Sequence, residues 1–242
     1  MLELKNVSYT AINEDGEKEI IKNVSLTLNE RFIAFTGPNG GGKSTLAKII
    51  MGIITPTSGQ FLLDGEDFTY LSLTERANKG VSFAFQQPVR FKGITVSDLI
   101  NIASGKKLKV NEICAFLSEV GLCAREYVNR VINASLSGGE LKRIEIAITM
   151  ARGSKFTIFD EPEAGIDLWS FNSLIKVFER LIKKTQGSVL IISHQERILN
   201  IADRIIIIAD GKIKSDGTKD EILPEILSQA TCSALTKEGD EK

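Results

Sequence analysis

The sequence is poor in cysteine, histidine and proline, and these shortages exclude several classes of protein. It has 3 cysteines, 5 prolines and 1 histidine among 242 residues. The cysteines are odd in number and far apart, so they predict neither a disulfide framework nor a zinc site of the CxxC type. The scattered cysteines are Cys114, Cys123 and Cys232.

The chain also lacks an excess of charge and a long hydrophobic run. Its 30 Lys and Arg against 31 Asp and Glu give a net charge of −1, which argues against binding nucleic acid by bulk positive charge. The longest strongly apolar run lies around 205–209 and is too short to span a bilayer. Met1 leads directly into the strand-like LELKNVSY without a signal-peptide pattern. We therefore expect a cytoplasmic chain that binds no nucleic acid and does not itself insert into a membrane.

Short apolar runs, typical of buried strands, alternate with amphipathic helical patterns along most of the chain. This alternation predicts an α/β fold with a mostly parallel sheet. The opening runs read as an antiparallel pair, and 86–153 reads as a helical insert, with Thr95 as a helix N-cap. The expected strands are 2–9, 19–28, 31–36, 61–63, 81–85, 155–161, 188–193 and 204–210; the longest expected helix is 167–184.

A glycine-rich loop follows the buried run 31–36 and opens a helix at Lys43. Its spacing fits GxxxxGK[ST], a loop whose backbone N–H groups cradle phosphates. We expect Lys43 to reach the β- and γ-phosphate oxygens, Ser44 to ligate Mg²⁺, and Thr45 to reach the α-phosphate. The loop itself consists of Gly37, Pro38, Asn39, Gly40, Gly41 and Gly42.

Polar residues follow three other strands, where ligands gather in open α/β sheets. Asp160 is predicted to hold Mg²⁺, and Glu161 to orient the attacking water. His194 is predicted to contact the γ-phosphate. Gln86 is predicted to offer an amide oxygen to Mg²⁺ and to touch the water.

A second candidate anion site lies nearly a hundred residues after the phosphate loop, in LSGGE before a helical pattern. Ser137, Gly138, Gly139 and Glu140 stand at this predicted helix start, where exposed N–H groups favour an anion. Composition and spacing leave open why one chain should carry two such sites.

The ordered set GPNGGGKST, FQQP, LSGGE, FTIFDEP, AGID and ISH resembles the ATP-binding-cassette (ABC) ATPases over almost the whole chain. The resemblance implies a single P-loop NTPase domain spanning 1–242: a core of 1–85 and 154–242 with an N-terminal antiparallel β subdomain, a helical subdomain of 86–153, and a flexible tail of 231–242. It implies that two copies dimerise head to tail on ATP. The signature of one copy, together with Asp167, would then complete the site of the other.

A narrower resemblance is to the SUF-system ATPases, which drive iron–sulfur cluster assembly on a SufB/SufD-like scaffold. Glu140 stands where transport members commonly have glutamine, and Glu163 stands two residues after Glu161. We expect the cluster to reside on the scaffold, because three scattered cysteines are a poor ligand set. Lys142 and Glu163 could form an ion pair that restrains Glu161, or an ordinary solvated pair.

Two points stay open from the sequence. The alternative function is the ATP-binding subunit of a membrane ABC transporter, which uses the same chemistry with another partner. In either case the partner is expected to dock near 83–105, whose apolar residues could equally be the core of the helical part. The adenine-stacking aromatic residue is absent near Ala11, and Tyr9 is a substitute or a packing residue at the sheet edge.

Overall fold

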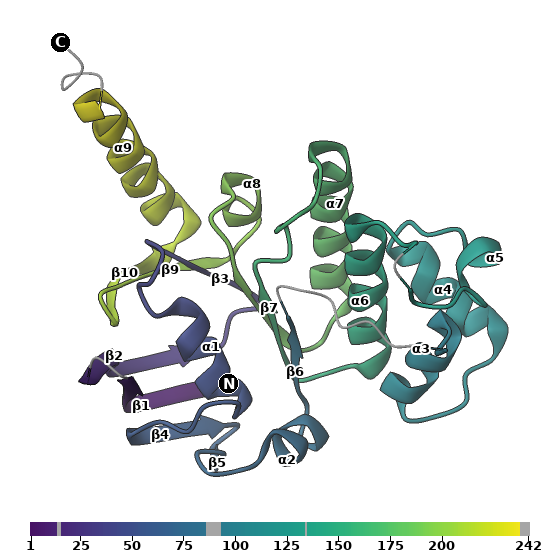
Figure 1. The fold of residues 1–242 in the computed structure, drawn as a ribbon, viewed down its shortest axis with the longest axis horizontal. Coiled ribbons are helices and arrows are strands. Elements are labelled where there is room, and N and C mark those ends of the chain that lie inside the picture. The colour runs from purple at the N-terminus through teal and green to yellow at the C-terminus, as the bar shows by residue number, and fades with distance from the viewer. Residues whose placement is uncertain (14–15, 86–92, 134, 238–242) are drawn as a thin grey trace.

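The structure, a computed structural model, describes residues 1–13, 16–85, 93–133 and 135–237 as two sheets with helices around them (Figure 1). The strands are β1 (Leu2–Asn13), β2 (Gly16–Leu28), β3 (Phe32–Thr36), β4 (Ser58–Leu63), β5 (Glu66–Asp67), β6 (Val81–Ala84), β7 (Phe156–Asp160), β8 (Ser188–Ile192), β9 (Arg204–Ala209) and β10 (Lys212–Thr218). The helices are α1 (Lys43–Met51), α2 (Leu73–Asn78), α3 (Val96–Ser104), α4 (Val110–Glu119), α5 (Ala124–Tyr127), α6 (Gly138–Arg152), α7 (Leu168–Lys184), α8 (Glu196–Leu199) and α9 (Lys219–Lys237).

The larger sheet has six strands in the order β10-β9-β3-β8-β7-β6. All neighbouring pairs are parallel except β10 with β9, so the predicted mostly parallel sheet is confirmed. Strands β3 and β7 are buried along their whole length, which is why they read as unbroken apolar runs rather than alternating ones.

The two faces of this sheet belong to two apolar cores, because successive side chains of a strand point to opposite faces. Phe32 and Ala34 of β3 lie in the core that includes α3, α4, α6 and α7. Ile33 and Phe35 of the same strand lie in the core shared with α1 and the smaller sheet. Helix α1 is thereby sandwiched between the two sheets.

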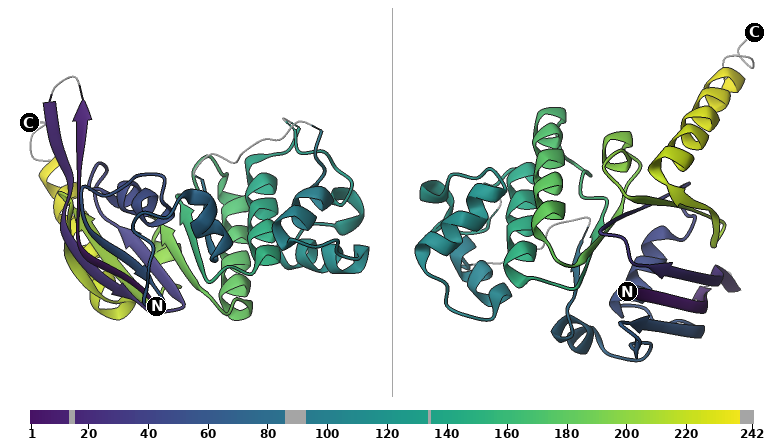
Figure 2. Two further views of the ribbon diagram at one scale, coloured as in Figure 1. Left: turned by 90° about the horizontal axis from the view of Figure 1, so that it is seen from below. Right: turned by 180° about the vertical axis from the view of Figure 1, so that it is seen from behind.

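The smaller sheet is antiparallel, with the order β2-β1-β4-β5. The hairpin of β1 and β2 matches the predicted antiparallel pair, with Leu2 opposite Leu28 and Leu4 opposite Leu26. Helices α3 to α6 lie at the opposite end of the molecule from this sheet (Figure 2). The predicted division into a core, a helical part and a tail stays a prediction.

The helical part begins where the sequence predicts. Thr95 caps α3 through a capping box: its hydroxyl accepts from the Asp98 N–H, and the Asp98 carboxylate accepts from the Thr95 N–H at 3.0 Å. Val96 is fully buried in the helical core, whereas Leu99 is half-buried. Phe91, another apolar residue of the expected docking segment, lies outside the described residues.

The C-terminal segment contains a helix, and the flexibility predicted for 231–242 stays a prediction. Helix α9 projects away from the body of the molecule (Figure 1) and runs to Lys237, through part of the tail predicted to be flexible. Within the described ranges, no helix is both long enough and apolar enough to cross a bilayer.

Candidate nucleotide-binding site

Three adjacent parallel strands deliver the predicted catalytic residues to one edge of the sheet. Phe35 of β3 and Asp160 of β7 both pair with Ile192 of β8, which sets the ends of the three strands side by side. The backbone bonds continue past the strands: the Glu161 N–H donates to the Ile192 carbonyl oxygen at 3.0 Å. The phosphate loop, the carboxylate pair and the histidine therefore follow neighbouring strand ends, the usual place for a ligand in an open α/β sheet.

The phosphate loop needs glycine because it runs against the backbone of β9. A Cβ added at Gly37 would lie 2.2 Å from the Ile208 carbonyl oxygen, and one at Gly41 would lie 2.6 Å from the same atom. Gly37 and Gly42 also have φ of +126° and +106°, which side-chain-bearing residues rarely adopt. Helix α1 then begins at Lys43, so the loop leads directly into a helix N-terminus, where anions bind.

Lys43 is buried and already occupies the loop. Its Nζ donates to the carbonyl oxygens of Gly37 at 2.7 Å and Pro38 at 2.9 Å. Burial lowers the pKa of Lys43, although the nearby carboxylates of Glu161 and Asp160 oppose this change. The ammonium group therefore sits inside the curled loop, next to the space where phosphates are predicted to bind.

Ser44 and Asp160 form a pair of oxygen ligands. The Ser44 Oγ donates to the Asp160 Oδ1 at 3.1 Å, across a sequence separation of 116 residues. Burial raises the pKa of Asp160, and the hydrogen bond from Ser44 opposes the change. A hydroxyl and a buried carboxylate at this distance suit Mg²⁺, which uses one or two protein oxygens beside phosphate oxygens. No cluster of three or more His, Cys, Asp or Glu side chains suited to a metal occurs among the described residues.

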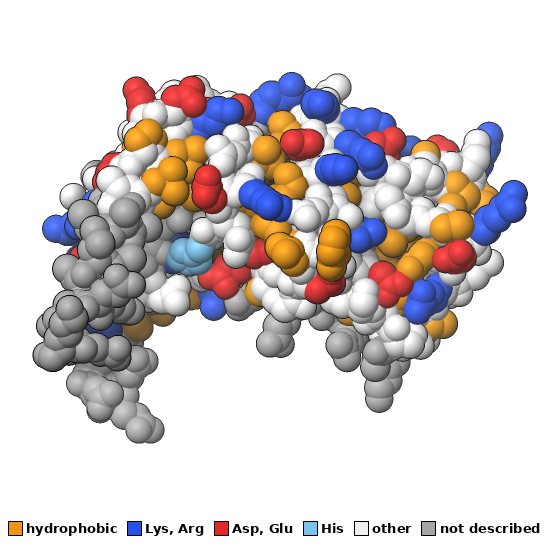
Figure 3. All heavy atoms as spheres, turned by 90° about the horizontal axis from the view of Figure 1, so that it is seen from above, with side chains coloured by type: hydrophobic (Ala, Val, Ile, Leu, Met, Phe, Trp, Pro, Cys, Tyr) orange, Lys and Arg blue, Asp and Glu red, His pale blue; other side chains and the backbone are white. Residues whose placement is uncertain are grey.

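Glu161 and His194 face each other across the ends of β7 and β8. The His194 Nε2 lies 3.8 Å from the Glu161 Oε1. Burial and the charge of Lys43 lower the pKa of His194, with Glu161 opposing them, and this direction favours the neutral imidazole. Glu161 has a φ of +43°, a rare conformation for a residue other than glycine, as strained residues at functional sites often show. Figure 3 shows this face, with the pale blue histidine beside a group of red carboxylate side chains.

Glu163 is held by Ser193 rather than by Lys142. Its carboxylate accepts a hydrogen bond from the Ser193 hydroxyl, and Ser193 is fully buried beside His194. Burial raises the pKa of Glu163, although the bond from Ser193 opposes the change. The expected Lys142–Glu163 ion pair is not formed: Lys142 pairs with Glu145 at 2.8 Å, because Glu145 lies one turn along the same helix.

The signature begins α6 and packs against the start of α7. Ser137 is the N-cap: its Oγ accepts from the Glu140 N–H at 3.2 Å, and the Glu140 Oε2 accepts from the Ser137 N–H at 2.6 Å. A Cβ on Gly139 would lie 2.9 Å from the Ser170 Cβ, and one on Gly138 would lie 3.2 Å from the Gly165 carbonyl oxygen. Both glycines thus have a packing role within this chain, beside any role toward a ligand.

Glu140 was expected to bind nucleotide, but its carboxylate is engaged within this chain. Tyr127 donates its hydroxyl hydrogen to the Glu140 Oε1, and the Arg130 Nη1 lies 3.4 Å from the same oxygen. Burial opposes ionisation, but the bonds from Tyr127 and Ser137 outweigh it and leave the pKa of Glu140 below its usual value. The sequence signal for this arrangement is the S-x-x-E pattern of a capping box.

The remaining predicted site residues fall in different places. Asp167 is the N-cap of α7, and its Oδ1 accepts from the Trp169 and Ser170 N–H groups, both at 3.0 Å. Thr45 lies half-buried in the first turn of α1, and Tyr9 packs against the core shared with α1. Gln86 lies outside the described residues, so its predicted contacts stay a prediction.

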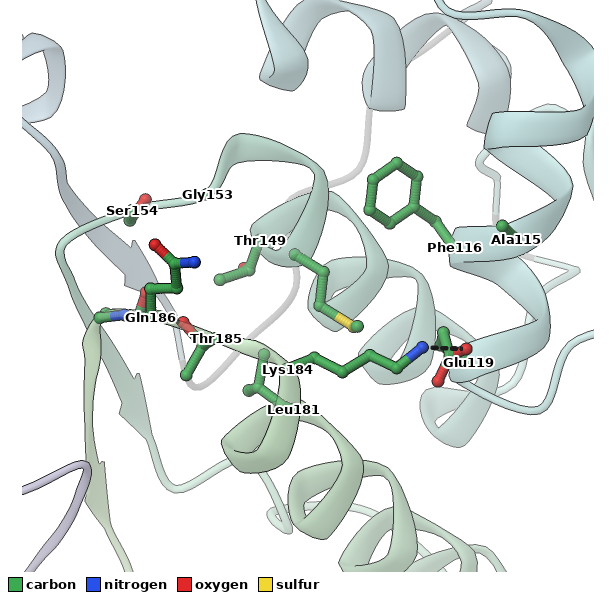
Figure 4. Close-up of a pocket in the computed structure, with 13 residues that line it drawn as sticks. Ala115, Phe116, Glu119, Thr149, Gly153, Ser154, Leu181, Lys184, Thr185 and Gln186 are labelled. Carbon is green, nitrogen blue, oxygen red and sulfur yellow. Dashed lines mark hydrogen bonds and ion pairs between the residues drawn. The ribbon is translucent and has the colours of Figure 1, made fainter.

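A further pocket lies elsewhere in the molecule. It has a volume of about 420 Å³ and is lined by residues of α4, α6 and α7 and by the N-terminal ends of β7 and β8. Phe116 and Leu181 face it, and the Lys184–Glu119 ion pair of 2.5 Å stands at one side (Figure 4). The predicted phosphate site lies at the opposite end of these strands, so this pocket is separate from it.

A phosphate loop between a buried strand and a helix, with a carboxylate pair and a histidine at adjacent strand ends, defines a P-loop ATPase. A protein-family model described as "ABC transporter" matches residues 21–164. The chain belongs to this ABC transporter family and is an ATPase of its cassette type.

Named relatives fit this family. The uncharacterized ABC transporter ATP-binding protein MJ0035 of Methanocaldococcus jannaschii is 40% identical over 217 residues, covering 86% of each chain. The probable ATP-dependent transporter ycf16 of Pyropia yezoensis is 33% identical, covering 90% of this chain and 91% of that one. The lipopolysaccharide export system ATP-binding protein LptB of Escherichia coli is 32% identical, covering 86% and 88%.

Solved structures agree with the fold. The dimeric structure of MJ0796, a bacterial ABC transporter cassette, superposes with a TM-score of 0.80 and 25% identity over 90% of this chain and 99% of that one. A dimeric post-hydrolysis state of the same cassette, bound to ADP and Pi, superposes with a TM-score of 0.79.

Proposed function

We propose that two copies of this chain close head to tail on ATP, and that each ATP is bound by the phosphate loop of one copy and the signature of the other. The observation that carries this proposal is the separation of the two half-sites. The phosphate loop, Asp160, Glu161 and His194 meet at one sheet edge. Ser137–Gly139 instead begin α6 and contact α7 of the same chain. The MJ0796 cassettes that superpose on this chain are dimeric, which supports this arrangement.

Within each half-site the side chains divide the work. Lys43 leaves the carbonyl oxygens of its own loop and binds the β- and γ-phosphates, while Thr45 binds at the α-phosphate. Ser44 and Asp160 would hold Mg²⁺, and the ion would supply positive charge to offset the charge on the transferred phosphoryl group. Glu161 accepts a hydrogen bond from the attacking water, and neutral His194 contacts the γ-phosphate. The inorganic phosphate then leaves as the dimer loosens.

For the partner, we infer a membrane component of a transporter. The relatives carry transporter names, among them a lipopolysaccharide export protein. An apolar groove of about 300 Å³ between β6, α3 and α6 gives a partner segment somewhere to dock, close to the predicted position. Its lining includes Phe83, Phe85, Leu99, Ile144 and Ile148.

The second candidate partner is a SufB/SufD-like scaffold of iron–sulfur cluster assembly. Its support is in the sequence: Glu140 and Glu163 occupy the positions that resemble the SUF-system ATPases. In the structure both carboxylates are hydrogen-bonded within the chain. They therefore indicate similarity to that branch of the family, and they give no evidence of contact with a partner. The names of the relatives favour the transporter.

The mechanism is tested with Glu161→Gln, which removes the group that orients the water and keeps its size. With ATP and Mg²⁺ this variant should sediment as a dimer, whereas with ADP it should sediment as a monomer. A Glu161→Gln chain that stays monomeric at saturating ATP contradicts the shared site. Affinity purification of the wild-type chain from its own cells then separates the partners, because a permease supports the first candidate and a soluble scaffold supports the second.

A further inference from the structure

Lys142 is a buried lysine that the ATPase mechanism leaves without a role. It lies in α6 five residues after Ser137, and its side chain is 2% exposed. Its Nζ donates to the Phe85 carbonyl oxygen at 2.5 Å and to the Glu145 Oε2 at 2.8 Å. A buried ammonium group is stable only with such partners, so the contact with Phe85 is part of the fold.

Glu145 contacts the other backbone group of Phe85. Burial raises the pKa of its carboxyl, while the Lys142 charge and a hydrogen bond from the Phe85 backbone oppose the change. Phe85 is thus bound at its N–H by Glu145 and at its carbonyl oxygen by Lys142. Two side chains one turn apart on α6 fasten the residue that follows β6.

The Phe85 ring points to a different environment from its backbone. The ring is 41% exposed, packs edge-to-face on Phe83 with 4.8 Å between centroids, and lines the apolar groove between β6, α3 and α6. A segment seated in this groove contacts the Phe85 ring, while the Phe85 backbone is bonded to the helix that begins with the signature.

Two apolar side chains in place of Lys142 and Glu145 would attach α6 to the end of β6 equally well. Replacing a buried ion pair by apolar residues is often neutral or stabilising, so attachment alone gives no reason for a buried lysine and glutamate here. What apolar side chains lack is a fixed geometry toward one backbone N–H and one carbonyl oxygen. Hydrogen bonds to both groups set the position of Phe85 relative to the first turns of α6.

We propose that Lys142 and Glu145 are positioning residues that make Phe85 and the signature helix move together, so that an occupant of the groove acts on the signature. This inference rests on the proposed function, in which the signature binds the ATP of a second copy. It adds a specific connection from the groove to that signature.

The test compares dimerisation in the Glu161→Gln background. The variant Lys142→Met/Glu145→Met keeps an apolar attachment and removes both bonds to Phe85. Its thermal midpoint should stay within about 3 °C of the parent, since such apolar replacements are often neutral. The ATP concentration for half-maximal dimer in sedimentation should rise about tenfold, within the usual range of coupling between sites. The control Lys155→Met removes the exposed Lys155–Asp64 pair and should change neither quantity.

A double-mutant cycle then tests the connection to the groove. Phe85→Ala removes the ring and keeps the backbone. When Lys142 and Glu145 are intact, Phe85→Ala should change the ATP concentration for half-maximal dimer severalfold. In the Lys142→Met/Glu145→Met variant it should leave that concentration unchanged. Additive effects, or an unchanged ATP requirement in the apolar pair, overturn the inference. If the apolar pair does not fold, Glu145→Gln is measured in its place under the same criteria. Absence of any dimer in Glu161→Gln alone refutes the proposed function instead.

Discussion

Replacement of Arg76 by methionine should destabilise the chain by about 3 kcal/mol, although the residue belongs to none of the predicted sites. Arg76 is 1% exposed and donates four hydrogen bonds, all to backbone carbonyl oxygens. Two of these carbonyls, of Ile49 and Ile50, belong to the last turn of α1, whose C-terminal carbonyls lack partners within the helix. Arg76 therefore caps the helix that carries Lys43.

The magnitude follows from the carbonyls that methionine would leave unpaired. The Ile49 oxygen also accepts from the Gly52 N–H, so it keeps one partner. The oxygens of Ile50, Thr69 and Leu71 lose the guanidinium bonds, at about 1 to 3 kcal/mol each. Burial is the main cause that lowers the pKa of Arg76 to about 10. Methionine avoids this cost of burying a charge, and the net loss is about 3 kcal/mol.

The assay is thermal unfolding of the nucleotide-free chain by circular dichroism. A loss of about 3 kcal/mol corresponds to a fall of roughly 6–12 °C in Tm for a domain of this size. Arg31→Met is the matched control, because Arg31 is exposed and makes one carbonyl bond, to Thr185 at 2.7 Å; its Tm should fall by less than about 2 °C. An Arg76→Met chain that melts within about 2 °C of the wild type refutes the capping argument.

Three further predictions concern the site. Gly139→Ala should abolish the ATP-dependent dimer by forcing α6 away from Ser170, and Gly139→Ala/Ser170→Gly should restore it; sedimentation of both in the Glu161→Gln background decides. Trp169, the single tryptophan, is 81% exposed beside the signature, so its fluorescence should shift to the blue when the dimer forms; an unchanged spectrum in a proven dimer places Trp169 outside the interface. Because burial raises the folded-state pKa of Asp160, its stabilising contribution is complete below the ordinary aspartate pKa and is lost as pH rises through the raised value. Asp160→Asn should therefore raise Tm at pH 7 while stopping hydrolysis. If the difference in Tm between this variant and the wild type is the same at pH 4 as at pH 7, the argument is contradicted.

The parts of the site that were predictable are those fixed by local sequence. The phosphate loop follows from glycine spacing between a strand and a helix, and the structure adds the reason, the approach of Gly37 and Gly41 to the Ile208 carbonyl. The capping box of Thr95 and Asp98 was equally readable, because its two partners stand three residues apart.

Contacts between residues far apart in the sequence could not be predicted from local sequence patterns. The bond from Lys142 to the Phe85 carbonyl oxygen joins positions 57 residues apart and depends on how α6 lies against β6, and no local pattern specifies that packing. The hydrogen bond from Ser193 to Glu163 joins positions 30 residues apart in two loops that meet because β7 and β8 are neighbours. The role of Arg76 likewise depends on a long-range contact, because the end of α1 that it caps lies 26 residues earlier in the chain.

The carboxylate of Glu140 raises a physical question that the structure answers. A negative charge beside a helix N-terminus would compete with a phosphate for the same N–H groups and repel it. Here the capping box directs one carboxylate oxygen to the Ser137 N–H, and Tyr127 and Arg130 approach the other. The negative charge is thus compensated within the helical part, and glutamate at this position is compatible with an anion site formed by Gly138 and Gly139. The same bonds fix the start of α6 to α5 and the loop after it, so the half-site that is proposed to meet a second copy is preorganised before any nucleotide binds.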